Sequence, residues 1–285
     1  MIVRARFNPC FAQANATRRR YRVLMGGAGS GKSCNVAQDF VLKLMDPKFA
    51  GANLLVLRKV EESNRSSTYP ELLSAIRRIC GPGWSRVWIS RSEPLGLRCA
   101  STGNEILFKG MKDGREREKL KSISCAGGKL TWVWMEEATE FLPEDLELVD
   151  DRLRGLLPEG LFYQITLTFN PVSASHWLKK RFFDRPDGQT FLHHSTYLDN
   201  AFVDGQYQKR MEGRRERDPE GYRVYALGEW GESGGLILPH YKAGEFSAAP
   251  HRFDGMALGQ DLASTTPTLS CCWGSRTERY SPATS

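Results

Sequence analysis

Apolar residues along the first 170 positions form short continuous runs separated by stretches of helical periodicity. Three of these runs are Val23–Met25, Asn53–Leu57 and Leu130–Met135. Runs of this kind are typical of strands buried on both faces of a parallel sheet. Ser33–Leu44 instead repeats apolar residues at helical spacing, and a helix around Tyr69–Cys80 is predicted to end at the following Gly-Pro-Gly. The pattern predicts an α/β fold with a mostly parallel sheet flanked by helices.

Weaker signals predict the remaining elements. Gly103-Asn104 is typical of a hairpin turn between two short strands. A helix is predicted over 143–156, with a proline at its start, and a further strand over Tyr163–Phe169. Residues 110–121 carry charges of both signs and are predicted to form a solvated loop and helix. The other predicted strands are Arg86–Ile89, Gly96–Cys99 and Glu105–Phe108.

The segment after the first apolar run matches a phosphate-binding loop. Gly26, Gly31, Lys32 and Ser33 satisfy the pattern G-x-x-x-x-G-K-[ST] between a predicted strand and a predicted helix. Glycines let the backbone turn so that its N–H groups point at phosphate oxygens. Lys32 would reach the β- and γ-phosphates, and Ser33 would bind Mg²⁺. The sequence therefore predicts nucleoside triphosphate binding, against the alternative of a glycine-rich turn that matches by accident. The residues predicted to hold the nucleotide are Gly26, Gly27, Ala28, Gly29, Ser30, Gly31, Lys32 and Ser33.

Two adjacent carboxylates follow the run Leu130–Met135. In phosphate-loop ATPases the strand beside the loop brings one carboxylate to the Mg²⁺ ion, and its neighbour polarises the attacking water. We predict Glu136 in the metal shell and Glu137 at the water. The strand must then end there, because adjacent strand residues point to opposite sides. The alternative is an acidic helix cap, with Glu137 and Glu140 in a first turn.

Polar residues also end the predicted strand Tyr163–Phe169. Thr168 and Asn170 lie at its tip, where both suit sensing of the γ-phosphate during catalysis. The alternative is ordinary turn chemistry, since an Asn-Pro pair favours a turn.

Composition and charge suggest a class of partner. The 285-residue chain is 40% hydrophobic and 26% charged, which is typical of a globular protein, and its net charge is +7. A basic balance suits a polyanion such as DNA. The run Arg18-Arg19-Arg20, with Arg22 close behind, is either a solvated patch or a rim of cations beside the nucleotide or the DNA.

The sequence contains no signal for membrane insertion or export. No apolar run approaches the roughly 20 residues that span a bilayer, and the first residues lack an apolar signal core. The seven cysteines include no C-x-x-C pair and no partner histidine at zinc-finger spacing. We therefore expect them to be reduced and mostly buried in a cytosolic protein.

Four features in this order resemble a known family. They are the phosphate loop, Trp134-Met-Glu-Glu-Ala138, Leu167-Thr-Phe-Asn-Pro171, and a late region in which Tyr197-Leu-Asp-Asn-Ala-Phe202 precedes Tyr222-Arg-Val-Tyr-Ala-Leu-Gly-Glu-Trp-Gly231. From about residue 20 to residue 261, the chain is similar to the large terminase subunit of tailed bacteriophages, the ATPase that pumps DNA into a prohead. The last signature is not a general feature of ATPases.

The resemblance implies a role for each motif. Residues 26–33 match the Walker A loop, and Glu136 stands where the family has its Walker B acid. Glu137 matches the catalytic glutamate, and Thr168–Asn170 the coupling motif that links hydrolysis to motion. The family also uses an arginine finger. Its candidates in this chain are Arg58, Arg115, Arg117, Arg152 and Arg154.

The resemblance also implies cofactors and partners. The cofactors would be ATP and Mg²⁺, and double-stranded DNA would be contacted at its phosphates, without sequence preference. Protein partners would be a portal protein, a small terminase subunit and further copies of the chain in a homo-oligomeric ring on the prohead. The chain would act in the host cytoplasm, encoded by a phage or an integrated prophage, with no membrane involved.

Members of the family carry a second, ribonuclease-H-like nuclease domain. Leu258-Gly-Gln-Asp261 resembles its first strand, which would make Asp261 the first metal ligand. The chain then departs from the family, since Ser264–Gly274 has no strand pattern and the other nuclease acids are absent. One carboxylate does not hold two Mg²⁺ ions. We therefore expect an ATPase domain over 1–231, a linker over 232–250 and a truncated, inactive nuclease domain over 251–285.

Two other interpretations stay open. One is a different phosphate-loop, DNA-dependent ATPase, such as a helicase-like enzyme, which ATP-driven duplex unwinding would favour over prohead-dependent packaging. The other is a non-enzymatic truncated remnant that folds poorly or only binds partners. Circular dichroism and an ATPase assay would distinguish the remnant from an enzyme.

The abrupt departure after Asp261 predicts that residues beyond about Leu262 are read in a shifted frame. If each codon starts at the last base of the preceding one, Cys272 and Trp273 must become Leu and Gly274 stays Gly. The shifted frame allows Asp-x-Gly-Phe-Asn-Asp-Pro-Asp-Ala-Val, which resembles the family's metal-binding strand and turn. We expect the gene sequence to continue into a nuclease-like frame downstream. The absence of such a frame would instead favour a natural early stop with a divergent tail.

Overall fold

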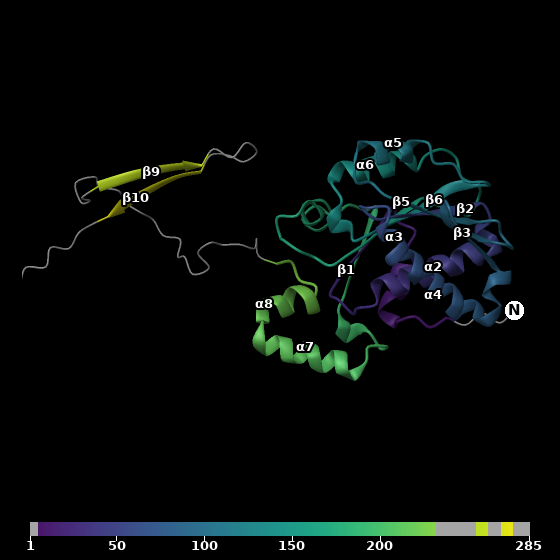
Figure 1. Cartoon of the computed structure of the whole chain (residues 1–285), viewed down its shortest axis with the longest axis horizontal. Helices are drawn as coiled ribbons and strands as arrows, with labels where there is room; N and C mark the ends of the chain where they lie inside the picture. The colour runs from purple at the N-terminus through teal and green to yellow at the C-terminus, as the bar shows by residue number, and fades with distance from the viewer. Residues whose placement is uncertain (1–4, 232–254, 262–268, 276–285) are drawn as a thin grey trace, which may run out of the picture. The chain divides into compact units, whose positions relative to one another are not determined.

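The structure, a computed structural model, describes residues 5–231, 255–261 and 269–275 (Figure 1). The chain divides into two units, residues 1–234 and 235–285, and each is described by itself.

An eight-stranded sheet forms the centre of the first unit. Its strand order is β3-β4-β5-β2-β6-β7-β1-β8, and the strands from β5 to β8 in this order are parallel, whereas β3, β4 and β5 pair antiparallel. This sheet confirms the predicted α/β fold. The strands are β1 (Tyr21–Gly26), β2 (Ala52–Leu57), β3 (Trp88–Ser92), β4 (Leu95–Cys99), β5 (Glu105–Lys109), β6 (Lys129–Glu136), β7 (Gln164–Phe169) and β8 (Thr190–Ser195).

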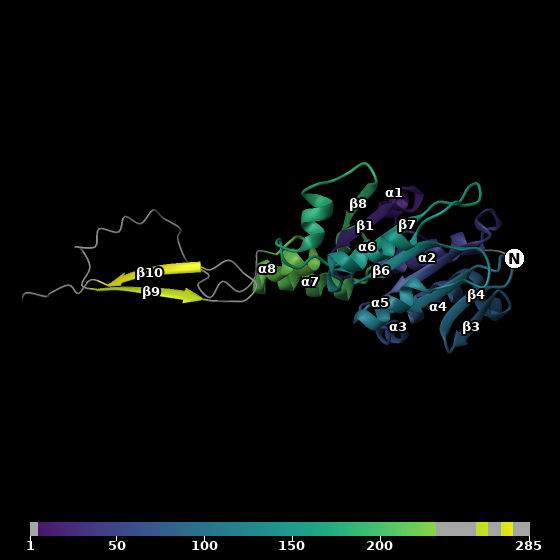
Figure 2. The ribbon, with the colours of Figure 1, turned by 90° about the horizontal axis from the view of Figure 1, so that it is seen from above.

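Helices cover both faces of the sheet (Figures 1 and 2). The α-helices are α1 (Ala12–Ala16), α2 (Lys32–Met45), α3 (Ser63–Ser66), α4 (Thr68–Cys80), α5 (Gly114–Lys121), α6 (Pro143–Arg152), α7 (Gly205–Arg217) and α8 (Pro219–Gly221). Shorter 3-10 turns are Pro9–Phe11, Pro47–Phe49, Gly81–Arg86, Ala138–Glu140 and Tyr197–Asp199, and π-helical turns are Lys179–Phe183 and Tyr222–Ala226.

Two buried apolar clusters hold these layers together. On one face, α2 and α4 bury Phe40 and Ile76 against strand residues such as Trp134. On the other face, α6 buries Leu146 against strand residues such as Val133. Neighbouring residues of β6 therefore face opposite layers, as the alternation of a strand requires. The central strands β1, β2 and β7 are buried along their whole length, which explains their continuous apolar runs.

Several sequence-based boundaries differ from the structure. The helix predicted over 143–156 ends at Arg152, because Leu153 leaves the helical conformation and Gly155 has a φ of +90°. The strand predicted from Arg86 begins at Trp88, because residues 81–86 form a 3-10 turn. Strand β8 was not predicted. It lies at the edge of the sheet and is only partly buried, so it lacks a continuous apolar run.

The second unit contains the strands β9 (Gly255–Asp261) and β10 (Leu269–Ser275), which pair antiparallel. The prediction that Ser264–Gly274 contains no strand is therefore wrong for residues 269–274. The large residues Leu269 and Trp273 alternate with the small residues Ser270 and Gly274, and an alternation of two residues is the period of a strand. The predicted linker over 232–250 lies outside the described residues.

Two further expectations concern membranes and cysteines. Among the helices in the described ranges, none is long and apolar enough to cross a bilayer. Within residues 5–231, Cys10, Cys34, Cys80, Cys99 and Cys125 are free thiols. Only Cys99 among them is fully buried, so the expectation of mostly buried thiols is wrong in degree.

The basic residues before and at the start of β1 lie in two environments. Arg18 and Arg19 are exposed, as a solvated patch requires, but Arg22 is completely buried. The guanidinium of Arg22 donates to the Asp39 carboxylate of α2 and, at 3.0 Å, to the Thr166 hydroxyl of β7. A buried charge is costly unless it is paired and hydrogen-bonded. Arg22 is therefore a structural link between β1, β7 and α2 and not part of a cationic rim.

Replacement of Arg22 tests this link. Arg22→Ala leaves Asp39 paired with Lys43 alone, and removal of one partner from a buried pair costs about 3 kcal/mol. We expect urea denaturation to show a loss of that size in the free energy of unfolding. Lys48→Ala is the matched control, because its ion pair with Asp46 lies at the surface, and its loss should stay below about 1 kcal/mol. Equal losses in both variants would contradict a structural role for Arg22.

Candidate active site

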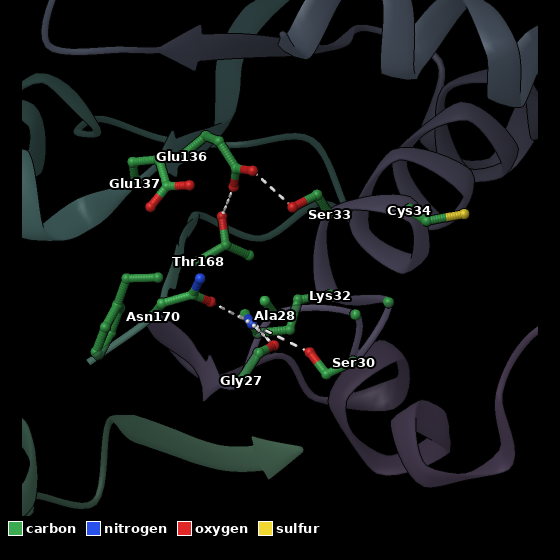
Figure 3. A pocket seen from close by; sticks show the side chains of 13 residues that line it. Gly27, Ala28, Ser30, Lys32, Ser33, Cys34, Glu136, Glu137, Thr168 and Asn170 are labelled. Atoms are coloured by element: carbon green, nitrogen blue, oxygen red, sulfur yellow. Dashed lines mark hydrogen bonds between the residues drawn. The ribbon is translucent and has the colours of Figure 1, made fainter. Parts of the chain in front are cut away.

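A cavity of about 190 Å³ lies where the carboxyl ends of β1, β6 and β7 meet the N-terminus of α2 (Figure 3). In open α/β sheets, ligands bind at this edge of the strands. Its lining residues are Gly27, Ala28, Gly29, Ser30, Gly31, Lys32, Ser33, Cys34, Glu136, Glu137, Thr168, Phe169 and Asn170. The structure therefore brings the two carboxylates and the strand tip to the loop, and Gly26 precedes the cavity at the end of β1.

The carboxylate strand lies beside the loop but does not pair with the strand that precedes the loop. β7 lies between β1 and β6. The register pairs Thr168 of β7 with Leu24 on one side and with Glu136 on the other. Glu136 therefore reaches the loop across the end of β7. The sequence signal could not show this, because strand order is a property of the assembled sheet.

The loop directs unpaired backbone N–H groups at the cavity. Within the described ranges, no acceptor receives a hydrogen bond from the amides of Gly29 or of residues 31–33. Gly29 and Gly31 have φ angles of 77° and 84°, a left-handed conformation that favours glycine. Unpaired amides at the start of a helix, together with its dipole, form a binding site for an anion.

Lys32 lies in the centre of this loop with its ammonium buried. Burial lowers the pKa of Lys32 to about 8, although the charges of Glu136 and Glu137 oppose the shift. The ammonium connects β1, the loop and the tip of β7, because its acceptors come from all three. They are the carbonyl oxygens of Gly26 (2.9 Å) and Gly27 (3.0 Å), Ser30 Oγ (3.1 Å) and Asn170 Oδ1 (2.9 Å).

Glu136 ends β6 and faces α2. Its Oε1 accepts a hydrogen bond from Ser33 Oγ at 2.6 Å, and its Oε2 accepts one from Thr168 Oγ1 (Figure 3). Burial raises the pKa of the Glu136 carboxyl, and the two hydroxyl donors and the charge of Lys32 act against that shift. The predicted pair of metal ligands, Ser33 and Glu136, is thus in direct contact.

Glu137 follows at the point where β6 ends. Its φ and ψ are 55° and 56°, and among the described residues it alone, apart from glycines, has a positive φ. This turn lets Glu137 line the same cavity as Glu136 instead of pointing to the opposite face of the sheet. No described residue donates a hydrogen bond to its carboxylate, and Figure 3 shows it beside Glu136 without a partner. Strained, unpaired polar groups of this kind cluster at functional sites.

The residues present suit a magnesium–triphosphate complex. A hydroxyl and a carboxylate are oxygen ligands, and Mg²⁺ takes one or two from a protein with the remainder from phosphates and water. Unpaired amides and the Lys32 ammonium are donors for phosphate oxygens. The donor set of the cavity therefore fits both groups.

A backing surface that sequence reasoning did not predict supports the loop. The amides of Gly27 and Ala28 donate to the carbonyls of Ser195 (3.1 Å) and Tyr225 (2.7 Å). A Cβ atom on Gly228, whose φ is +67°, would lie 2.3 Å from the Gly27 nitrogen. The signature Tyr222–Gly231 thus packs against the loop. Its resemblance to the family was the sequence signal that could have indicated this supporting surface.

Two asparagines fasten the other end of the loop. Asn200 Nδ2 donates to the Gly29 carbonyl at 2.7 Å, and Asn8 Nδ2 donates to Asn200 Oδ1 at 2.8 Å. The ring of Tyr207 lies against Gly29 from α7. Asn200 belongs to the family stretch Tyr197–Phe202, whereas no sequence pattern indicated Asn8 or Tyr207. The contact of all three with the loop was not predicted, because they come from segments far apart in the chain.

No candidate for the arginine finger lines the cavity. Arg117 Nε donates to Asp145 at 2.7 Å, and Arg152 donates to the Ile123 carbonyl. Arg115 and Arg154 are exposed. Arg58 follows β2 at the same edge of the sheet, where its Nη2 lies 3.4 Å from the carboxylate of Glu140. Arg58 is thus the candidate that contacts the segment carrying Glu137.

Comparison with known proteins identifies the family. The family model for the phage terminase large subunit matches residues 18–229. The PBSX phage terminase large subunit of Bacillus subtilis is 34% identical over 250 residues, which are 81% of this chain and 53% of that protein. The chain belongs to the phage terminase large subunit family. The terminase large subunit of Bacillus phage SPP1 is 30% identical over 268 residues, which are 90% of this chain and 61% of the phage protein.

Solved terminases share the fold. The large terminase of a thermophilic bacteriophage matches with a TM-score of 0.66 at 17% identity, over 95% of this chain and 65% of that one. The HK97 bacteriophage large terminase matches with a TM-score of 0.58 at 10% identity, over 79% of this chain and 51% of its own. This terminase chain spans between half and two thirds of the length of these four relatives.

One predicted site residue of the terminase chain belongs to the second unit. Asp261 is the last residue of β9, where it pairs with Leu269 of β10. The position of its side chain lies outside what the structure describes. Its assignment as a metal ligand stays a prediction.

Substitution of Gly228 tests the backing of the loop. A methyl group there meets the Gly27 nitrogen at 2.3 Å and strains the left-handed backbone. Strain of this kind costs about 1–3 kcal/mol, so Gly228→Ala should weaken binding of a fluorescent ATP analogue by about tenfold or more. Gly213→Ala in α7 is the control, because its Cβ would meet nothing closer than 3.8 Å, and its affinity should not change. Wild-type affinity in Gly228→Ala would show that the loop does not need this support.

Proposed function

We propose that this chain hydrolyses ATP and couples hydrolysis to the movement of double-stranded DNA into a phage prohead. The contact between Ser33 and Glu136, with Glu137 directly beside it, carries the proposal. It joins the loop that would bind phosphates to the carboxylates that would bind the metal and orient water. Family membership supports it, and the large terminase of the thermophilic bacteriophage has been solved with ADP and with ATP-gamma-S.

Each step of hydrolysis has a residue in this cavity. The amides of Gly29 and of residues 31–33 hold the phosphates, and Lys32 neutralises the charge that develops on them. Ser33 and Glu136 would hold Mg²⁺, which would supply positive charge to stabilise the phosphates. Glu137, whose carboxylate has no partner among the described residues, orients the attacking water and accepts its proton.

The tip of β7 connects this chemistry to the rest of the unit. Asn170 shares the Lys32 ammonium with the loop, so engagement of Lys32 by a phosphate changes what Asn170 contacts. The next residues, Val172 to Ala174, hydrogen-bond with the backbone of Gly231. Asn170 is therefore suited to transmit the nucleotide state, together with Thr168, as the coupling motif. For the arginine finger we propose Arg58, on the contact with Glu140.

The partners follow from the proposed role. DNA would be contacted at its phosphates, with an affinity that falls steeply with salt. A portal protein, a small terminase subunit and further copies of this chain in a ring would complete the motor in the host cytoplasm. We propose residues 1–231 as the ATPase domain, followed by a linker, and β9 as the start of a nuclease-type domain with Asp261 as its first metal ligand.

Replacement of the two central groups tests the proposal. Glu137→Gln keeps the shape of the side chain but removes the base, so ATP should still bind while DNA-stimulated phosphate release falls by about 100-fold or more. Lys32→Ala should lose both binding and hydrolysis. Glu159→Gln changes an exposed glutamate away from the cavity and should hydrolyse ATP like the wild type.

The results for these variants distinguish the role of Glu137 from that of Lys32. Normal hydrolysis by Glu137→Gln would remove Glu137 from catalysis, and normal hydrolysis by Lys32→Ala would remove the phosphate loop from it. A wild-type chain that binds no ATP would contradict the proposed function altogether.

A further inference from the structure

Two buried tryptophans of β6 differ by one hydrogen bond. Trp132 and Trp134 lie on the face of the strand that α2 covers, and both side chains are fully buried. The indole Nε1 of Trp134 donates to Thr168 Oγ1 at 2.7 Å. Within the described residues, the indole Nε1 of Trp132 has no acceptor. The two residues therefore offer the same buried ring in the same apolar cluster, with and without a polar contact.

The hydrogen bond from Trp134 fixes the direction of the Thr168 hydroxyl. An indole N–H only donates, so the hydroxyl oxygen must be the acceptor in this contact. A hydroxyl has one hydrogen to donate, and Thr168 directs it at Glu136 Oε2. Without the indole, the hydroxyl could turn toward the carbonyl of Met135, which lies at 3.5 Å. Trp134 thus selects the carboxylate over the backbone as the partner of Thr168.

The orientation of Glu136 depends on this selection. Its two oxygens have different donors, Ser33 Oγ on α2 and Thr168 Oγ1 on β7. Ser33 is itself a proposed metal ligand, so Thr168 is the donor that holds Glu136 independently of the metal. Figure 3 shows Thr168 below the carboxylate, bonded to a different oxygen from the one that Ser33 contacts. Neighbouring hydrogen-bond partners of this kind orient metal-binding carboxylates.

We propose that Trp134 is a positioning residue for the magnesium–nucleotide site. It acts through Thr168, whose hydroxyl it directs at Glu136, and it touches neither the nucleotide nor the metal. The inference rests on the proposed function, because it takes Glu136 as the metal-binding carboxylate. It assigns a role to the polar atom of a tryptophan that otherwise belongs to the apolar core.

The test compares Trp134→Phe with Trp132→Phe. Both variants replace a buried indole by a phenyl ring, but only the first removes a hydrogen bond to the site. Binding of a fluorescent, non-hydrolysable ATP analogue is titrated with Mg²⁺, so that the readout is affinity and not turnover. We expect Trp134→Phe to need about three to ten times more Mg²⁺ for half-maximal enhancement of binding. Trp132→Phe should need the wild-type concentration, even if both lose thermal stability.

A second pair of variants tests the same contact from its other partner. Thr168→Val keeps the shape and removes the hydroxyl, so its Mg²⁺ requirement should rise at least as much as in Trp134→Phe. Thr168→Ser keeps the hydroxyl and should lie closer to the wild type than Thr168→Val does. If Trp134→Phe does not fold, this pair still tests whether the Thr168 hydroxyl affects the Mg²⁺ requirement.

The results distinguish this inference from the proposed function. Equal Mg²⁺ requirements in Trp134→Phe and Trp132→Phe would overturn the role of Trp134, while nucleotide binding by the wild type would leave the proposed function intact. Equal requirements in Thr168→Val and Thr168→Ser would overturn it as well. A wild-type chain without Mg²⁺-dependent nucleotide binding would overturn both.

Discussion

A half-buried carboxylate at the end of β6, that of Glu136, connects the elements that form the candidate site. Glu136 loses hydration on burial, so its charged form needs hydrogen-bond donors within the fold. The donors come from the first turn of α2 and from the tip of β7. This requirement holds the helix that follows the phosphate loop and two parallel strands in one register. The same three elements bring Lys32 and Asn170 together, so the polar edge of the sheet forms as one unit.

The phosphate loop depends on a second constraint, which is the close approach of backbone to backbone. Gly228 packs against Gly27, and the amide of Ala28 bonds to Tyr225. A side chain at either glycine would push the two segments apart. Rigid support behind a binding loop keeps its donors in place, and in this chain the support comes from the region after β8. The family signature Tyr222–Gly231 therefore has a structural role, which is to support the phosphate loop.

Polar and charged groups in the core, like those in the site, bond to partners on neighbouring elements. Arg22 lies on the α2 side of the sheet, paired with Asp39 and bonded to Thr166 of β7. Trp134 pairs with Thr166 in register and bonds to Thr168. Buried polar contacts of this kind specify one arrangement of neighbouring elements. The layer between the sheet and α2 thus combines an apolar core with a few polar contacts. One of these, from Trp134 to Thr168, reaches a residue that lines the cavity.

Local patterns in the sequence were enough to predict the α/β class, the phosphate loop and the pair Glu136–Glu137, because each rests on period, glycine spacing or adjacent charge. They did not reveal that β7 separates β1 from β6, that Arg22 is buried, or that Asn8, Asn200 and Gly228 hold the loop. These features join segments that are distant in the chain, and only packing brings them into contact. The edge strand β8 was missed for a related reason, since partial burial removes the apolar run that reveals a central strand. Local physics therefore determined which residues carry the chemistry, and long-range packing determined which residues hold them in place.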